Sequence, residues 1–189
     1  IEFLDNSPTC FQAVENFRKM LKDAGYSELL ECEKWEIVPG EKYFVTRNDS
    51  SIIAFSVPKK DFTGFQLICS HTDSPSFKIK ENAEMDADGK YTKLNVEGYG
   101  GMLCAPWFDR PLSVAGRIAV RTEKGIETRL VNLDQDLAMI PNLAVHMNRE
   151  ANSGYKYNIQ KDMLPIVGEA SSKGKLMNLV AENAGVKEE

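Results

Sequence analysis

The segment Ser70–Pro75 holds the side chains best suited to metal binding or catalysis. Residues two apart at a strand end point to the same side, so the His71 imidazole and the Asp73 carboxylate are predicted to be neighbours. A zinc-binding histidine commonly donates its second ring N–H to a carboxylate, which fixes the tautomer and raises the basicity of the ring. The spacing therefore favours His71 as a metal ligand, about 2.0 to 2.1 Å from a zinc ion, with Asp73 behind it.

The same pair also has a structural interpretation, because a His-x-Asp motif alone is weak. In that alternative His71 is a hydrogen-bonded histidine at the end of a strand, and Asp73 is a turn residue before Pro75. One histidine and one carboxylate suit several divalent ions, so the residues leave the metal open among zinc, manganese and cobalt.

Three further polar residues have simpler interpretations when they are taken alone. His146 follows Leu143–Val145 and is predicted to end a short helix, on its half-buried face. Asp134 and Asp136 lie two apart after a predicted strand, but no histidine lies near them in the sequence. Both are predicted to be loop acids.

Two glycine-rich or aromatic segments are predicted to be structural. Tyr99–Gly101 is interpreted as a loop that uses the freedom of glycine at positive φ, because no phosphate-binding G-K-[ST] follows it. Trp107–Arg110 is interpreted as a packed aromatic residue with an Asp109–Arg110 surface pair.

A buried strand is predicted to position His71. Phe65–Cys69 is nearly all apolar, as in a strand covered on both faces of a mixed sheet, and it runs directly into Ser70. Open α/β sheets hold their sites at such strand ends.

Other elements of the N-terminal part are predicted from caps and periodicity. Ser7 and Pro8 predict the start of an amphipathic helix that Gly25 ends. Short β-branched and aromatic runs predict two strands, Tyr43–Arg47 and Ser51–Val57.

The residues after Pro75 have a different pattern, with tight turns at Asp88-Gly89 and Thr122–Gly125. Such hairpins predict a small, mainly antiparallel β domain, and the boundary is placed around Ser74–Ile79. The predicted strands are Tyr91–Val96, Leu112–Arg121 and Ile126–Leu133, and the predicted helices are Pro141–Met147 and Lys175–Ala184.

Composition excludes several classes of partner. The net charge is −5, with 23 basic residues mixed among 28 acidic ones, so neither nucleic acid nor a membrane is expected as a partner. Because the sequence has no apolar run of about 18 residues and no signal-peptide pattern, a cytoplasmic protein is expected. Its four cysteines stand far apart and are predicted to be reduced.

The sequence resembles the N-terminal part of the aspartyl aminopeptidase family along nearly its whole length. Its H-T-D-S-P motif is the sharpest match, and several others follow in the family's order. The matching segments are Phe3–Asp5 with Ser7–Pro8, Lys42–Asn48, Ser51–Phe55, Leu67–Pro75, Tyr99–Gly101, Trp107–Leu112, Ala115–Arg117 and Ile140–His146.

The resemblance implies a binuclear zinc exopeptidase that removes N-terminal aspartate or glutamate from peptides. Its fold would be α/β, with residues 1–76 as the N-terminal part of a mixed-sheet catalytic domain. Residues 77–189 would be an inserted, mainly antiparallel β dimerisation domain with short helices, itself incomplete. The implied partners are an acidic peptide substrate and further copies of the chain, in a dimer-based and twelve-membered tetrahedral homo-oligomer.

The resemblance also implies roles for three residues. His71 would bind one of the two zinc ions of a complete site, and Asp73 would orient it. His146 would reach from the dimerisation domain into the active site of a neighbouring subunit, near the scissile carbonyl.

The family's other site residues would follow Glu189: a bridging aspartate, paired glutamates that include the general base, a further aspartate and a histidine. The chain also lacks an initiator methionine, so it is expected to be a fragment and inactive alone. Two alternatives stay open. One is a non-catalytic oligomerisation or peptide-binding module, and the other is a sister metallopeptidase of different specificity.

Overall fold

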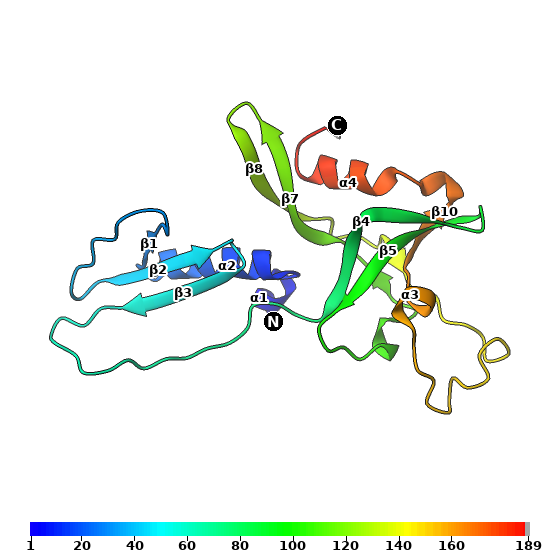
Figure 1. The fold of residues 1–189 in the computed structure, drawn as a ribbon, viewed down its shortest axis with the longest axis horizontal. Coiled ribbons are helices and arrows are strands. Elements are labelled where there is room, and N and C mark those ends of the chain that lie inside the picture. Colours follow the sequence, from blue (N-terminus) through cyan, green and yellow to red (C-terminus); the bar gives the residue numbers. More distant parts are fainter. Residues whose placement is uncertain (188–189) are drawn as a thin grey trace. The chain divides into compact units, whose positions relative to one another are not determined.

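The computed structural model describes residues 1–187, and the chain divides into two compact units, Ile1–Ser74 and Pro75–Glu189 (Figure 1). Helices and β-sheet occur in both, which confirms the mixed α/β fold class. The assignment of residues 1–76 and 77–189 to a catalytic and a dimerisation domain stays a prediction. Within residues 1–187, no helix has the length and apolar character needed to cross a membrane.

The first unit packs a helix against a three-stranded sheet in the order β1-β2-β3. The central strand β2 runs parallel to β1 and antiparallel to β3, and both predicted strands are confirmed. Val14 of the long helix and Phe44 of β2 are completely buried. The elements are α1 (Glu2–Asp5), α2 (Cys10–Asp23), β1 (Ser27–Leu29), β2 (Lys42–Arg47) and β3 (Ser51–Ser56).

Helix α2 begins at Cys10, so the prediction that Ser7 caps it was wrong. Thr9 has the extended backbone of a cap, and its hydroxyl accepts the N–H of Phe11 at 3.2 Å. The Ser7 hydroxyl instead accepts a hydrogen bond from the Asn16 amide at 3.0 Å.

Arg18 joins α2 to the rest of the first unit. Its guanidinium group lies 2.8 Å from Glu15, 2.9 Å from Glu28 in β1 and 2.8 Å from Asp49 in the turn after β2. Burial lowers the pKa of Arg18, but hydrogen bonds with Asp49 and Glu15 outweigh this effect and raise the pKa above its ordinary value. The charged group therefore holds three elements together.

The segment Phe65–Cys69 is not a strand, which corrects the prediction of a buried strand before His71. Residues 57–75 form no helix or strand, and Leu67 and Ile68 are 81% and 95% exposed. A strand needs a neighbour that pairs with its N–H and C=O groups. No strand within residues 1–187 pairs with this segment, so its apolar composition does not make it a strand.

The second unit is built on a five-stranded sheet in the order β4-β5-β10-β9-β6. The strand predicted at Tyr91–Val96 is confirmed as part of β5, whereas β4, β9 and β10 were not predicted. The strands are β4 (Ser76–Ala87), β5 (Tyr91–Tyr99), β6 (Pro111–Leu112), β9 (Ala138–Met139) and β10 (Ile166–Glu169). Short helical turns follow β5 at η1 (Ala105–Trp107), precede β10 at α3 (Ile159–Asp162) and join β10 to the last helix at η2 (Ala170–Ser172).

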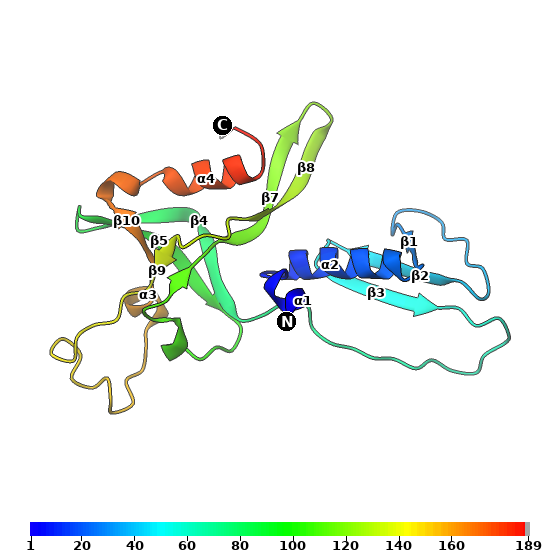
Figure 2. The ribbon, with the colours of Figure 1, turned by 180° about the vertical axis from the view of Figure 1, so that it is seen from behind.

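Helix α4 (Lys175–Asn183) covers the core of the second unit, and its prediction is confirmed (Figure 2). Leu176 and Val180 on this helix belong to one buried cluster with Leu94 and Val96 of β5. The cluster also includes Val131 of the separate two-stranded ribbon, β7 (Ala115–Thr122) with β8 (Gly125–Asn132).

Both predicted hairpin turns are confirmed. Asp88 and Gly89 join β4 to β5 with φ of 54° and 65°, as a type I′ turn requires. Residues Thr122–Gly125 join β7 to β8. The predicted strand from Leu112 begins later, at Ala115, because Leu112 pairs with Ala138 as part of β6.

The helix predicted at Pro141–Met147 was wrong, because residues 141–158 contain only turns and irregular chain. The N–H of Asn142 is donated to the Asp109 carboxylate at 2.8 Å, and the N–H of Leu143 to the Asn142 side chain at 2.9 Å. Side-chain acceptors of this kind compete with the helical pattern.

Glu84 caps α4 from a distant strand. A bulge between Ile79 and Glu84 shifts the β4–β5 register, and the Glu84 carboxylate accepts the N–H groups of Gly174 and Leu176, the latter at 3.0 Å. An anion at a helix N-terminus satisfies free N–H groups and complements the helix dipole.

We expect Glu84→Ala to lower the free energy of unfolding of the second unit by about 1 kcal/mol, because the N-terminus of α4 loses its acceptor. Glu84→Gln keeps one acceptor oxygen and should cost less. Hydrogen exchange of the α4 amides measures the effect. Glu81→Ala, an exposed change on the same strand, is the control, and equal effects of the two alanine variants would contradict this cap.

Candidate functional site

His71 lies in the irregular segment after β3, and Asp73 holds its ring. Nδ1 of the ring is 2.8 Å from the backbone carbonyl oxygen of Asp73 and 3.3 Å from its carboxylate Oδ1. A carbonyl oxygen only accepts hydrogen bonds, so Nδ1 carries the proton, and in the neutral ring Nε2 keeps its lone pair. This tautomer is the one that a metal ligand binding through Nε2 requires.

The segment around His71 is anchored to the β2–β3 turn. The hydroxyl of Thr72 donates a hydrogen bond of 2.7 Å to the backbone oxygen of Ser50. The side chains of His71 and Asp73 are 80% and 43% exposed, respectively. The histidine is therefore oriented by its neighbours along the chain while its ring remains accessible.

One oriented histidine fits a metal centre but does not complete one. Zinc takes three or four protein ligands. Within residues 1–187, no three His, Cys, Asp or Glu side chains gather in a group that could hold an ion. The four cysteines are free thiols. In the described part of the chain, the candidate ligand His71 thus has no two further ligands grouped beside it.

His146 belongs to the second unit. His146 is exposed in a loop of residues 141–158 between β9 and α3. Its neighbours Val145 and Met147 are 52% and 74% exposed. The residue is therefore on an open, partly apolar loop rather than at the end of a helix.

Asp109 forms a contact that the sequence analysis missed. The predicted Asp109–Arg110 surface pair is replaced by two other contacts: Asp109 Oδ1 accepts the N–H of Asn142 at 2.8 Å, and Arg110 donates to the backbone oxygen of Pro106 at 3.4 Å. Asp109 has a positive φ of 55°, which the dipeptide Asp-Arg does not predict. No short-range pattern could have linked it to Asn142.

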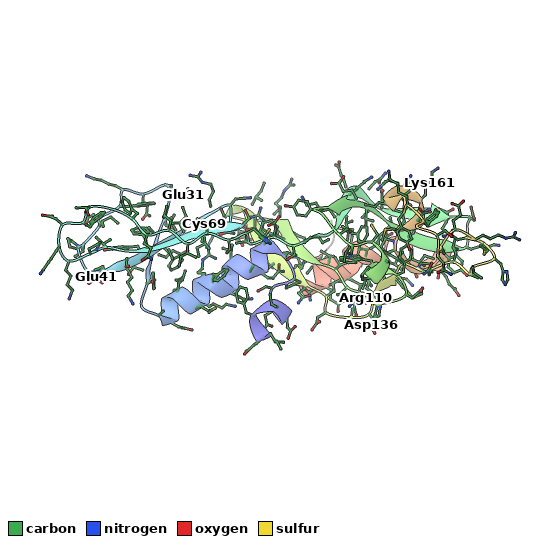
Figure 3. The ribbon with its side chains drawn as sticks, turned by 90° about the horizontal axis from the view of Figure 1, so that it is seen from below. Glu31, Glu41, Cys69, Arg110, Asp136 and Lys161 are labelled. Atoms are coloured by element: carbon green, nitrogen blue, oxygen red, sulfur yellow. The ribbon has the colours of Figure 1, made fainter. Side chains whose placement is uncertain are left out.

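The remaining candidate residues lie in or next to loops and have structural roles. Asp134 and Asp136 lie in the loop between β8 and β9, as predicted, and the side chain of Asp136 is exposed (Figure 3). Gly100 has a φ of 75°, and a Cβ there would lie 3.4 Å from Pro75. The predicted loop is therefore confirmed at Gly100 and Gly101, whereas Tyr99 is the last residue of β5.

Comparison with known proteins gives a consistent family match. The family described as aminopeptidase I zinc metalloprotease (M18) matches residues 3–189. A probable M18 family aminopeptidase 2 from Clostridium novyi is 49% identical over 92% of the chain, and one from Clostridium acetobutylicum is 46% identical over 98%. The chain spans 41% and 45% of the lengths of these relatives.

Solved structures show the same fold. Ape4, in a structure of the Ape4 and Nbr1 complex, is 37% identical with a TM-score of 0.90, and the match covers 97% of this chain and 38% of that one. Chaetomium thermophilum mApe1 is 32% identical with a TM-score of 0.88, covering 99% and 46%. A structure of the S. cerevisiae mApe1 dodecamer is 25% identical with a TM-score of 0.77, covering 98% and 43%.

The resemblance first seen in motifs such as His71–Pro75 thus extends over almost every described residue. The chain belongs to the M18 family, the aminopeptidase I zinc metalloproteases.

Proposed function

We propose that this chain forms the N-terminal part of a cytoplasmic zinc aminopeptidase that removes aspartate or glutamate from the N-termini of peptides. The observation that carries the proposal is the family match over residues 3–189. The tautomer of His71, set by the 2.8 Å contact with the Asp73 carbonyl, supports it at the level of the site.

In the proposed site, His71 binds one of two zinc ions through Nε2, and Asp73 keeps its ring oriented. When bound, such a pair of ions polarises a carbonyl group and lowers the pKa of bound water. The other ligands and the general base lie outside residues 1–187 in this proposal.

The proposed role of His146 is to donate a hydrogen bond to the oxyanion that develops on the scissile carbonyl of a substrate in a neighbouring subunit. Its exposure on an open loop supports this role, because a side chain that acts in another subunit must leave its own surface. The proposed assembly is a homo-oligomer, in keeping with the dodecamer of S. cerevisiae mApe1.

We expect the natural gene product to bind two zinc ions and to cleave peptides with N-terminal Asp or Glu, and this chain alone to do neither. Metal analysis and peptide hydrolysis, run side by side on both, measure this. Cleavage of neutral N-termini in preference would favour a sister peptidase of other specificity. Absence of metal and of hydrolysis in both would favour a non-catalytic assembly or peptide-binding module.

We expect His71→Ala and His146→Ala to separate two roles in the gene product. The first should remove activity together with one metal ion, because a ligand is lost. The second should lower kcat by about 10²- to 10³-fold with metal content unchanged, because a donor to the oxyanion is lost. Equal loss of metal in the two variants would contradict this division.

We expect Asp73→Ala to weaken metal binding by about tenfold, at the low end of the effect of removing a ligand's hydrogen-bond partner. The reason is that the nearer acceptor of the His71 ring is the backbone carbonyl of residue 73, which the substitution keeps. Competition with a chelator measures the affinity. The control is Asp61→Ala, an exposed change in the same irregular segment. If Asp73→Ala lowers the metal affinity as much as His71→Ala does, the expectation is refuted.

A further inference from the structure

The loop of residues 141–158 is long for a segment without helix or strand, yet buried residues flank it. Ile140 before it and Met163 after it are both completely buried. Loops longer than about 12 to 15 residues without secondary structure are commonly functional. This one exposes His146, so the position of its ends decides where that imidazole can reach.

Asp109 holds the start of the loop on both sides of Pro141. Its N–H donates to the backbone oxygen of Ile140 at 2.9 Å, and its Oδ1 accepts the N–H of Asn142 at 2.8 Å. Proline has no N–H, so the N–H of Asn142 is the first that the loop offers. Asp109 therefore binds one backbone group on each side of Pro141.

The preceding residue, Phe108, contacts the end of the same loop. Its ring lies 4.9 Å from that of Tyr157, which in turn lies 5.3 Å from Tyr155 in an edge-to-face arrangement. The hydroxyl of Tyr155 donates to Asp162 of α3 at 3.1 Å, and this hydrogen bond raises the pKa of Tyr155 above its ordinary value.

The Phe108–Asp109 step is itself fixed to the sheet. Trp107 packs edge-to-face on Phe77 of β4 with ring centroids 5.0 Å apart, and Phe108 forms a β-bridge with Ile140. Two adjacent residues on a fixed segment thus bring the two ends of the loop together.

We propose that Asp109 is a positioning residue for His146: it fixes the start of the 141–158 loop and thereby the place of the imidazole. The expected effect of Asp109 on turnover rests on the proposed function, whereas its expected effect on the loop does not. It requires two properties of residue 109, tolerance of positive φ and an acceptor for the Asn142 N–H.

The substitutions at residue 109 separate these two properties. Asparagine keeps both, because it tolerates positive φ and its amide oxygen accepts the N–H. Glycine keeps only the backbone freedom. Asp88, with a φ of 54° in the β4–β5 turn, provides a matched Asp88→Gly control away from the loop.

The first test is hydrogen exchange of the backbone amides of residues 142–147 in the natural gene product. We expect Asp109→Gly to speed their exchange by about tenfold, in line with the loss of a charge-assisted hydrogen bond. Asp109→Asn and Asp88→Gly should leave it near the natural rate. Unchanged exchange in Asp109→Gly would overturn the proposal.

The second test is a double-mutant cycle on kcat with a peptide that begins with aspartate. We expect Asp109→Gly to lower kcat several-fold with little change in KM, and Asp109→Asn to have nearly the natural kcat. In a His146→Ala background, Asp109→Gly should lower kcat no further. Independent losses in the double variant would overturn a role through His146. If His146→Ala alone leaves kcat unchanged, the proposed role of His146 fails, and hydrogen exchange still decides whether Asp109 fixes the loop.

Discussion

Burial of β5, an interior strand of the five-stranded sheet, is the constraint on which the second unit depends. Thr92, Leu94 and Val96 are 1%, 2% and 1% exposed, and the strand pairs with β4 along one edge and β10 along the other. With both edges occupied, other elements can attach only to its faces or to the outer strands. Helix α4 covers the apolar cluster through Leu176 and Val180.

Strand β5 and its neighbour β4 hold the two ends of the loop that carries the second candidate histidine. A Cβ at Gly98 would lie 2.5 Å from Ile159 Cδ1, so the Ile159 side chain of α3 packs directly on this glycine of the strand. The Gln160 side chain donates to a carbonyl oxygen of β5 at 2.6 Å. At the other end, Trp107 is held by Phe77 of β4, which is itself paired with β5. An exposed loop can therefore have a defined position without secondary structure of its own.

His71 is oriented differently, by hydrogen bonds of its own short segment. Its ring bonds to a residue two positions away, and the next residue, Thr72, bonds to the β2–β3 turn. These contacts set the tautomer before any metal is present. Contacts of such short range cannot bring further ligands to the histidine, because the ligands of a metal centre come from distant parts of a chain.

Sequence by itself determined the features that depend on neighbours along the chain. The Asp88-Gly89 turn and the helix ending before Gly185 follow from local geometry, and the ordered motifs identified the family. His71 and Asp73 are also neighbours, but in an irregular segment rather than at the predicted strand end, and the nearer partner of the ring is the Asp73 carbonyl. Tertiary structure alone decided that apolar Phe65–Cys69 is not a strand, because a strand exists only where another chain segment pairs with it. It also decided that Asp109 reaches Asn142, since contacts between residues far apart in sequence depend on how the buried strands bring them together.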